Sequence, residues 1–199
     1  ALARDRHHGL GGSRARMPAA VAPAGEPLRN RQVLSMLNLL RNDLRQTIDN
    51  GASADMTPPA TPRAWIAPLR HRYTQLFDEL DLAVRWEVPQ AWNGAPSALQ
   101  CLALTRLIEE ALTNVIKHSR ARRVGVALRQ PAPGELLLEI EDDGVGFDVD
   151  AVRAANLSVG VRSMATRIAR VGGTLDIASA PGRTRLLARL ALPPATAIT

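Results

Sequence analysis

The sequence predicts an α+β fold, a two-layer α/β sandwich in which helices pack on one face of a mixed, mostly antiparallel sheet. Two observations support this class. Helical and strand-like apolar patterns follow one another through residues 63–194, and strand-like runs are separated by short turns rich in Pro and Gly. In addition, hydrophobic residues make up 46% of the 199 residues, which is enough for a sizeable core.

A helical segment is expected over residues 1–50, before the sandwich. Three prolines between residues 18 and 27 interrupt it, because a Pro inside a helix removes a hydrogen bond and clashes with the preceding turn. From Leu28 to about Asp49 apolar residues recur at helical spacing, which predicts an amphipathic helix. These apolar residues are Val33, Met36, Leu37, Leu40 and Leu44. Residues 51–62 are rich in Ala, Pro, Thr and Ser and are expected to form a linker.

The first half of the sandwich is expected to contain two helices and a strand. A helix is predicted over about Ala64–Leu80, although Pro68 fits only the first turn of a helix and therefore favours a later start. Apolar residues at every second position predict a strand over Leu82–Val88. A long helix should run from Ser97 to about His118, because Ser97 and Gln100 form a capping box.

The second half is expected to contain four strands and one helix. The predicted strands are residues 124–128, 136–141, 175–178 and 186–192, and the predicted helix is residues 161–171, which Gly172-Gly173 ends. The longest irregular stretch lies between Asp142 and Gly160. Long loops in compact domains are commonly functional lids, so this stretch is expected to carry function.

Composition limits the classes of function. The net charge is +6, but the arginines are scattered along the chain and aromatic residues are only 3%, which does not favour a nucleic-acid partner. Cys101, the single cysteine, excludes an internal disulfide, and its apolar neighbours predict a buried thiol. No apolar run approaches the ~20 residues that cross a bilayer. This fragment is therefore expected in the cytoplasm, and any membrane anchor of a longer protein is expected upstream.

Polar residues converge on one face of the helix predicted from Ser97. Glu110, Asn114, Lys117 and His118 recur at helical spacing, while the opposite face is apolar. An Asn carbonyl oxygen suits Mg²⁺, and an ammonium group suits a phosphate. Glu110 can bind Mg²⁺ through water or act as a base. The alternative interpretation is a solvated helix face.

Two glycine-containing segments add further candidates. Asp142-Asp143-Gly144-Val145-Gly146-Phe147 follows a predicted strand; its glycines allow close approach of the backbone to a ligand, and its carboxylate can accept a hydrogen bond from an exocyclic amine. Gly160 opens a helix, whose free backbone N–H groups suit an anion. A simple turn and a Gly-initiated helix are the alternatives. The usual phosphate-loop and dinucleotide motifs are absent.

Taken in order, four segments resemble the histidine kinase ATPase domain. They are Glu-Ala-Leu-Thr-Asn-Val-Ile-Lys-His (110–118), Asp-Asp-Gly-Val-Gly-Phe (142–147), Gly-Val-Arg-Ser-Met (160–164) and Gly-Gly-Thr-Leu-Asp-Ile (172–177). The resemblance covers about residues 64–193, and it is strongest to the subgroup that pairs with NarL-type response regulators. The family is similar in its ATP-binding fold to gyrase and MutL.

The resemblance implies a site for ATP and Mg²⁺. At the phosphate end, Asn114 would coordinate Mg²⁺ with help from Glu110, and Lys117 and His118 would lie beside the phosphates. Positioning and charge neutralisation dominate phosphoryl transfer, so such groups would be sufficient.

At the base end, Asp142 would bind the adenine amino group, with Gly144 and Gly146 shaping the pocket. Gly160 would lie in a mobile lid over the phosphates. One departure concerns Ser179-Ala180-Pro181-Gly182-Arg183-Thr184, which is one Gly shorter than the pattern of the family.

The residues from Ala3 to Gly11 resemble the phosphoacceptor segment of the same subgroup. His7 stands at the position of the histidine that takes the phosphoryl group, and a neutral imidazole nitrogen is a reasonable nucleophile. His8 stands where the pattern has an Asp, the expected general base. The resemblance implies transfer from His7 to an Asp of a response regulator, and a homodimer held by the apolar stripe of residues 28–50. The alternative is that this stripe packs on the ATP-binding domain.

Three other functions stay open at this stage. One is an ATP-binding interaction module without kinase activity, which His8 and the prolines favour. Another is an anti-sigma-type serine kinase of the same fold, which would not need His7. The last is a basic nucleic-acid binder, whose binding would depend steeply on salt.

Overall fold

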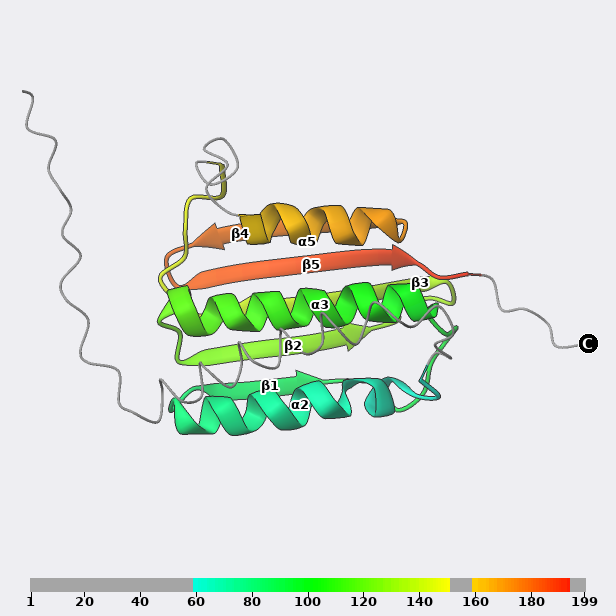
Figure 1. Cartoon of the computed structure of the whole chain (residues 1–199), viewed down its shortest axis with the longest axis horizontal. Helices are drawn as coiled ribbons and strands as arrows, with labels where there is room; N and C mark the ends of the chain where they lie inside the picture. The colour runs from blue at the N-terminus through cyan, green and yellow to red at the C-terminus, as the bar shows by residue number, and fades with distance from the viewer. Residues whose placement is uncertain (1–58, 151–158, 194–199) are drawn as a thin grey trace, which may run out of the picture.

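The computed structural model describes residues 59–150 and 159–193, which form two layers (Figure 1). The helical elements in these ranges are α2 (Pro62–Glu79), α3 (Ala98–Asn114), the π-helical turn η2 (Val115–Ser119) and α5 (Val159–Arg170). The strands are β1 (Ala83–Glu87), β2 (Arg123–Arg129), β3 (Glu135–Asp142), β4 (Gly173–Ala180) and β5 (Arg183–Ala191).

The strands form one sheet in the order β1-β2-β3-β5-β4. Only β1 and β2 are parallel; the other neighbouring strands are antiparallel. Figure 1 shows α2, α3 and α5 side by side on one face of this sheet. This arrangement confirms the predicted fold class, a helical layer on a mixed and mostly antiparallel sheet.

The core lies between the two layers. Tyr73 and Phe77 of α2, Leu104 of α3 and Met164 of α5 are among its buried side chains. Cys101 is also buried, as predicted, and burial raises the pKa of its thiol to about 11. A thiol with such a pKa stays protonated near neutral pH and acts as a small apolar side chain.

Helix α2 starts at Pro62, two residues before the predicted start, and contains Pro68 in its interior. The expectation that Pro68 requires a later start was therefore wrong. Pro68 cannot donate a hydrogen bond to the carbonyl of Ala64, but both residues are exposed, so water can satisfy that carbonyl. The cap by Thr61, which accepts from Ala64 N at 3.1 Å, and the buried apolar face stabilise the helix.

Helix α3 has the predicted start and a different end. The Ser97 side chain accepts from Gln100 N at 3.2 Å and the Gln100 side chain accepts from Ser97 N at 3.0 Å, which confirms the capping box. After Asn114 the chain continues as η2, and Arg120 ends it with φ 53°. The α-helical spacing assumed through His118 is therefore wrong for its last turn.

The sheet face opposite the helices carries cross-strand ion pairs. Glu139 accepts hydrogen bonds from Arg185 and Arg129, and Glu141 accepts one from Arg183 at 2.8 Å. Burial raises the pKa of Glu139, but the hydrogen bonds and charges of the two arginines outweigh it, so this pKa lies below its usual range. These arginines are neutralised by neighbouring carboxylates and contribute little to a free basic surface.

The predicted helical segment 1–50, its apolar stripe, His7 and most of the linker lie outside the described residues, as do residues 151–158 of the expected lid. Within the ranges that are described, no helix is both long and apolar enough to cross a membrane.

Candidate functional site

A pocket of about 340 Å³ opens between the layers, where α3 and β3 end and α5 and β5 begin. In Figure 1 these ends meet at the left of the molecule. A volume of this size is typical of small-molecule sites. The pocket is lined by Ala111, Asn114, Val115, His118, Ser119, Ile140, Asp142, Gly146, Phe147, Val161, Met164, Ile177, Thr184 and Leu186.

Asp142 is the polar residue at the base of the pocket. It is the last residue of β3 and only 6% exposed. Its Oδ1 accepts a hydrogen bond from Gly144 N at 2.9 Å. Burial raises the pKa of Asp142, and the charge of Asp143 adds to this, while the Gly144 hydrogen bond partly offsets it. A carboxylate offers about four acceptor positions, so Asp142 retains capacity for a donor on a ligand.

Asp143, the next residue, holds the start of β2 through hydrogen bonds. Its Oδ1 accepts from Arg122 N and Arg123 N, both at 2.8 Å, and its Oδ2 accepts from Arg123 Nε at 3.0 Å. The hydrogen bond from the Arg123 backbone, followed by those from Arg122 N and the Arg123 side chain, lowers the pKa of Asp143. The two adjacent aspartates therefore have different roles: Asp142 faces the pocket, and Asp143 holds the start of β2.

Gly144 and Gly146 let the loop after β3 pass between two neighbouring backbones. A Cβ atom on Gly144 would lie 2.2 Å from the Ser119 carbonyl oxygen. Gly146 has φ +69°, and a Cβ atom there would lie 2.4 Å from the Ala180 carbonyl oxygen. Val145 N also donates to Ser119 O at 2.7 Å. No larger residue fits at either glycine without displacing backbone, so the loop wall depends on both.

Only two of the four polar residues predicted to share one face of α3 line the pocket. Asn114 and His118 line the pocket, whereas Glu110 and the exposed Lys117 are not among its lining residues. Glu110 instead contacts the start of α5, because a Cβ atom on Gly160 would lie 2.3 Å from Glu110 Oε1. Gly160 is the second residue of α5 and packs against this carboxylate.

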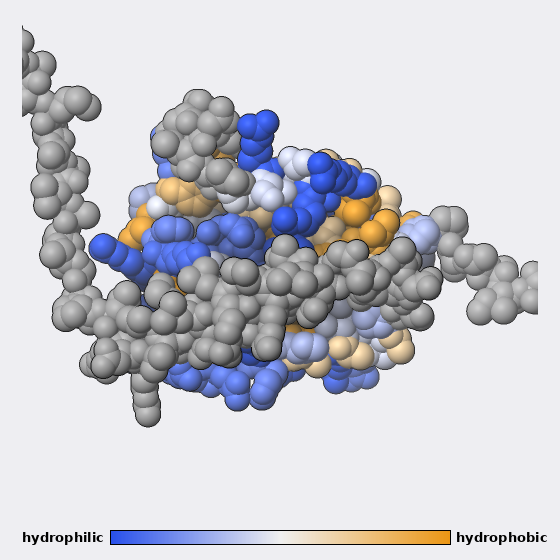
Figure 2. All heavy atoms as spheres, viewed as in Figure 1, coloured by the Kyte–Doolittle hydropathy of each residue, from blue (hydrophilic) through white to orange (hydrophobic). Residues whose placement is uncertain are grey.

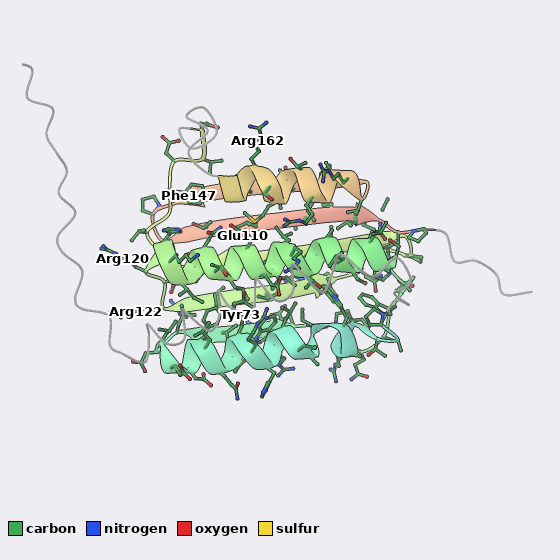
Figure 3. All side chains as sticks on the ribbon, viewed as in Figure 1. Tyr73, Glu110, Arg120, Arg122, Phe147 and Arg162 are labelled. Atoms are coloured by element: carbon green, nitrogen blue, oxygen red, sulfur yellow. The ribbon has the colours of Figure 1, made fainter. Side chains whose placement is uncertain are left out.

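Several lining residues were not chosen from the sequence. One of them is Thr184, which is 5% exposed and paired directly with Asp142 across β3 and β5. Thr184 and the inward-facing Leu186 are separated by one residue on the same strand. The alternation of side chains along a strand could therefore have identified Thr184 as inward-facing. The others are Ala111, Val115, Ser119, Ile140, Phe147, Val161, Met164, Ile177 and Leu186. Figure 3 shows Phe147 at the same end of the molecule as Arg120 and Arg122.

The surface near this end is partly charged. Where Figure 2 is not covered by grey atoms, hydrophilic residues are prominent at the left of the visible face. Arg120 and Arg122 are exposed, and Figure 3 shows them at the outer end of the molecule, away from the interior. Over the described ranges, no group of three or more His, Cys, Asp or Glu side chains is arranged to hold a metal ion.

Curated proteins similar to this chain include sensor histidine kinases. The sensor histidine kinase LiaS of Bacillus subtilis is 33% identical over 119 residues, 58% of this chain and 31% of that protein. The sensor histidine kinase ComP of Bacillus subtilis is 35% identical over 82 residues, 41% of this chain and 10% of that protein. The sensor protein VraS of Staphylococcus aureus is 37% identical over 78 residues, 39% of this chain and 22% of that protein. The chain thus spans no more than about a third of the length of these relatives.

Solved structures share the fold. The histidine kinase AdeS of Acinetobacter baumannii superposes with a TM-score of 0.58 at 14% identity, covering 80% of each chain. The histidine kinase domain of the Erythrobacter litoralis blue-light activated histidine kinase EL346 gives 0.52 at 21% identity, covering 81% of this chain and 73% of that one. Residues 101–195 match the family of histidine kinase-, DNA gyrase B- and HSP90-like ATPases. This region of the chain is therefore similar in sequence to that ATPase family and to sensor histidine kinases, and the described residues share the fold of the solved histidine kinases.

Proposed function

We propose that this chain binds ATP with Mg²⁺ in the pocket and is the catalytic part of a two-component sensor histidine kinase. The observation that carries the proposal is the buried carboxylate of Asp142 at the base of a pocket of about 340 Å³ whose helical wall presents Asn114. A buried acceptor suits an aromatic base, and an amide on the opposite layer suits a metal with phosphates.

The base would bind between the layers. Asp142 would accept a hydrogen bond from the adenine amino group, and the Thr184 hydroxyl, beside it across the strands, would offer a second polar contact. Apolar side chains such as Ile140 and Met164 would cover the base. Gly144 and Gly146 would keep the loop close enough to form the pocket wall.

The phosphates and Mg²⁺ would lie along the end of α3 and the start of α5. Mg²⁺ takes oxygen ligands, keeps several waters and commonly shares phosphate oxygens, so it does not need a cage built only from protein. Asn114 would coordinate it and Glu110 would assist through water. Lys117 and His118 would lie beside the phosphates, and Gly160 would bring the start of α5 close to them. The residues present therefore fit a metal that arrives with the nucleotide.

The proposed reaction runs through His7. An imidazole nitrogen of His7 would form a bond to the γ-phosphorus while the bond to the leaving ADP oxygen breaks. The phosphoryl group would then pass to an Asp carboxylate of a response regulator, which we propose to be of the NarL type. A homodimer through the apolar stripe of residues 28–50, and a cytoplasmic location where ATP is available, belong to the same proposal.

A second candidate is an ATP-binding interaction module without kinase activity. His8 favours it, because the family pattern has an Asp at that position as general base. Without that base, the His7 imidazole would lack the partner that activates it.

Incubation of the full chain with ATP labelled at the γ-phosphate separates the two candidates. We expect acid-labile label that disappears in His7→Ala and in Asp142→Asn, because one removes the acceptor and the other the base contact. ATP binding measured in parallel by calorimetry is the control, and His7→Ala should retain it. ATP binding without label on His7 would support the interaction module instead of the kinase. Acid-stable label on another protein would indicate a serine kinase.

A further inference from the structure

The π-helical turn η2 changes which residues after Asn114 face the pocket. On an α-helix, the residues three and four positions after Asn114 would share its face, and these are Lys117 and His118. A π-helical turn closes one residue later, with hydrogen bonds between residues i and i+5. The pocket is accordingly lined by Asn114, His118 and Ser119, the residues at i, i+4 and i+5. Lys117 is exposed and is not among the lining residues.

The Ser119 side chain spans this turn. Its hydroxyl donates to Val115 O at 2.9 Å, and its Oγ accepts from Ala121 N at 3.0 Å. Both directions are fixed, because a carbonyl oxygen can only accept and an amide N–H can only donate. The Ser119 carbonyl oxygen also accepts from Val145 N at 2.7 Å, which ties the turn to the loop after β3. These contacts hold η2 in the observed register.

The observed register also carries a backbone cost. Arg120, which follows η2, has φ 53°, a left-handed value that is unfavourable for a residue with a Cβ atom. Strained residues and π-helical turns are both frequent at functional sites, where two local conformations lie close in free energy. The hydrogen bonds of Ser119 stabilise the register that this strain opposes.

We infer that Ser119 is a positioning residue that keeps Lys117 out of the pocket until a triphosphate draws it in. The inference rests on the proposed binding of ATP. If η2 closes as an α-helical turn, Lys117 joins Asn114 on the pocket face, and its ammonium group meets the phosphates. The triphosphate favours that register, and the hydrogen bonds of Ser119 oppose it. A ligand that binds the less populated of two states gains affinity when that state becomes easier to reach.

The first test compares the affinities for ATP with Mg²⁺ and for adenosine, measured by calorimetry on the full chain. Ser119→Ala removes both side-chain hydrogen bonds, so it should raise the ratio of ATP affinity to adenosine affinity about threefold to tenfold, the range for one net hydrogen bond. A ratio is used because burial raises the pKa of Asp142, and the Ser119 hydroxyl is among the hydrogen bonds that partly offset this. An effect of the substitution on the base contact therefore changes both affinities alike.

Lys117→Met and Thr74→Ala are the two controls. With Lys117→Met already present, Ser119→Ala should leave the ratio unchanged, because no ammonium group remains to reach the phosphates. Thr74→Ala removes a helical hydroxyl outside the pocket, one that accepts from Trp86 Nε1 at 3.2 Å. It should leave the ratio of the wild type unchanged.

The second test needs no variant, because Lys117 is the single lysine of the chain. An amine-reactive reagent should modify Lys117 readily in the free chain, where its side chain is exposed, and mass mapping distinguishes this site from the amino terminus. Saturating ATP with Mg²⁺ should slow the modification of Lys117 strongly. Saturating adenosine should leave its rate unchanged, because adenosine has no phosphate to attract the ammonium group.

Three results would overturn the inference alone, with wild-type ATP binding intact. They are an unchanged ratio in Ser119→Ala, a raised ratio that persists when Lys117→Met is present, and modification of Lys117 at the same rate with and without saturating ATP. A wild-type chain that binds no ATP would overturn the proposed function itself, and this inference with it.

Discussion

At the scale of single residues, two adjacent aspartates show how the environment shifts the pKa of identical side chains in opposite directions. Asp143 is tied by backbone and side-chain hydrogen bonds to the start of β2, which lower its pKa. Asp142 is buried beside the pocket, which raises its pKa. The motif alone places both at a strand end, but only burial and the alternation of β3 decide which one faces a ligand.

This difference predicts a pH dependence of nucleotide binding. An ionised carboxylate is the stronger acceptor for an amino group, so binding should weaken as the pH falls through the pKa of Asp142. Because burial raises that pKa, the loss should begin at a higher pH than for an exposed Asp. Calorimetry with adenosine from pH 8 down to about pH 4 would measure it, since adenosine has no phosphate to titrate. An affinity that stays constant down to about pH 4, where an exposed Asp is itself about half protonated, would contradict the assignment of Asp142.

At the scale of elements, the loop after β3 owes its path to its contacts with α3 and the turn between β4 and β5. Local sequence identified the loop through its glycines. It did not indicate that Ser119 and Ala180, distant in sequence, supply the backbone that these glycines approach. Local sequence was also insufficient at η2, the turn after α3. The α-helical spacing of its residues did not indicate the π-helical turn that precedes Arg120.

Gly146→Ala should damage the pocket more than the fold. The substitution combines a positive φ, which costs about 1–2 kcal/mol for a residue with a Cβ, with a clash against the backbone of Ala180. The loop must then move away from the turn, and ATP affinity should fall at least about tenfold, which corresponds to about 1.4 kcal/mol. Calorimetry would measure the affinity, and urea unfolding the stability.

Gly172→Ala is the matched control for backbone strain. Gly172 follows α5 outside the pocket lining and has φ +76°, but a Cβ atom there would meet nothing within 4 Å. The stability of this variant should fall only by the cost of the positive φ, while its ATP affinity should stay close to that of the wild type. Equal loss of ATP affinity in both variants would show that the contact with Ala180 is unimportant.

At the scale of the whole molecule, the pocket joins the two layers. Its walls come from α3, η2 and α5 on one side and from β3, β4 and β5 on the other. A ligand there contacts the folded arrangement of both layers, and no such surface exists in the unfolded chain. Ligand binding and folding are therefore linked.

ATP should therefore stabilise the chain against unfolding. At a free ATP concentration of about 100 times Kd, the free energy of unfolding should rise by about 2.7 kcal/mol. Urea unfolding with and without ATP and Mg²⁺ would measure the change. Asp142→Asn is the control and should show much less stabilisation at the same ATP concentration. Equal stabilisation of both proteins would place the nucleotide elsewhere.

The sequence by itself determined the order of helices and strands, the fold class, the capping box at Ser97 and the burial of Cys101. These depend on apolar periodicity and on contacts within a few residues, which one sequence displays directly. The local motifs also named Asn114, His118, Asp142 and Gly146, which the structure brings to one pocket.

Only the tertiary structure decided that Thr184 lies beside Asp142 at the pocket. Their alignment requires β5 to lie next to β3, in a register that pairs these two residues across more than forty positions of sequence. Such pairing follows from how all five strands bury their inward faces together, and no local pattern contains it. The same non-local packing separated Glu110 from the pocket and placed its carboxylate against Gly160.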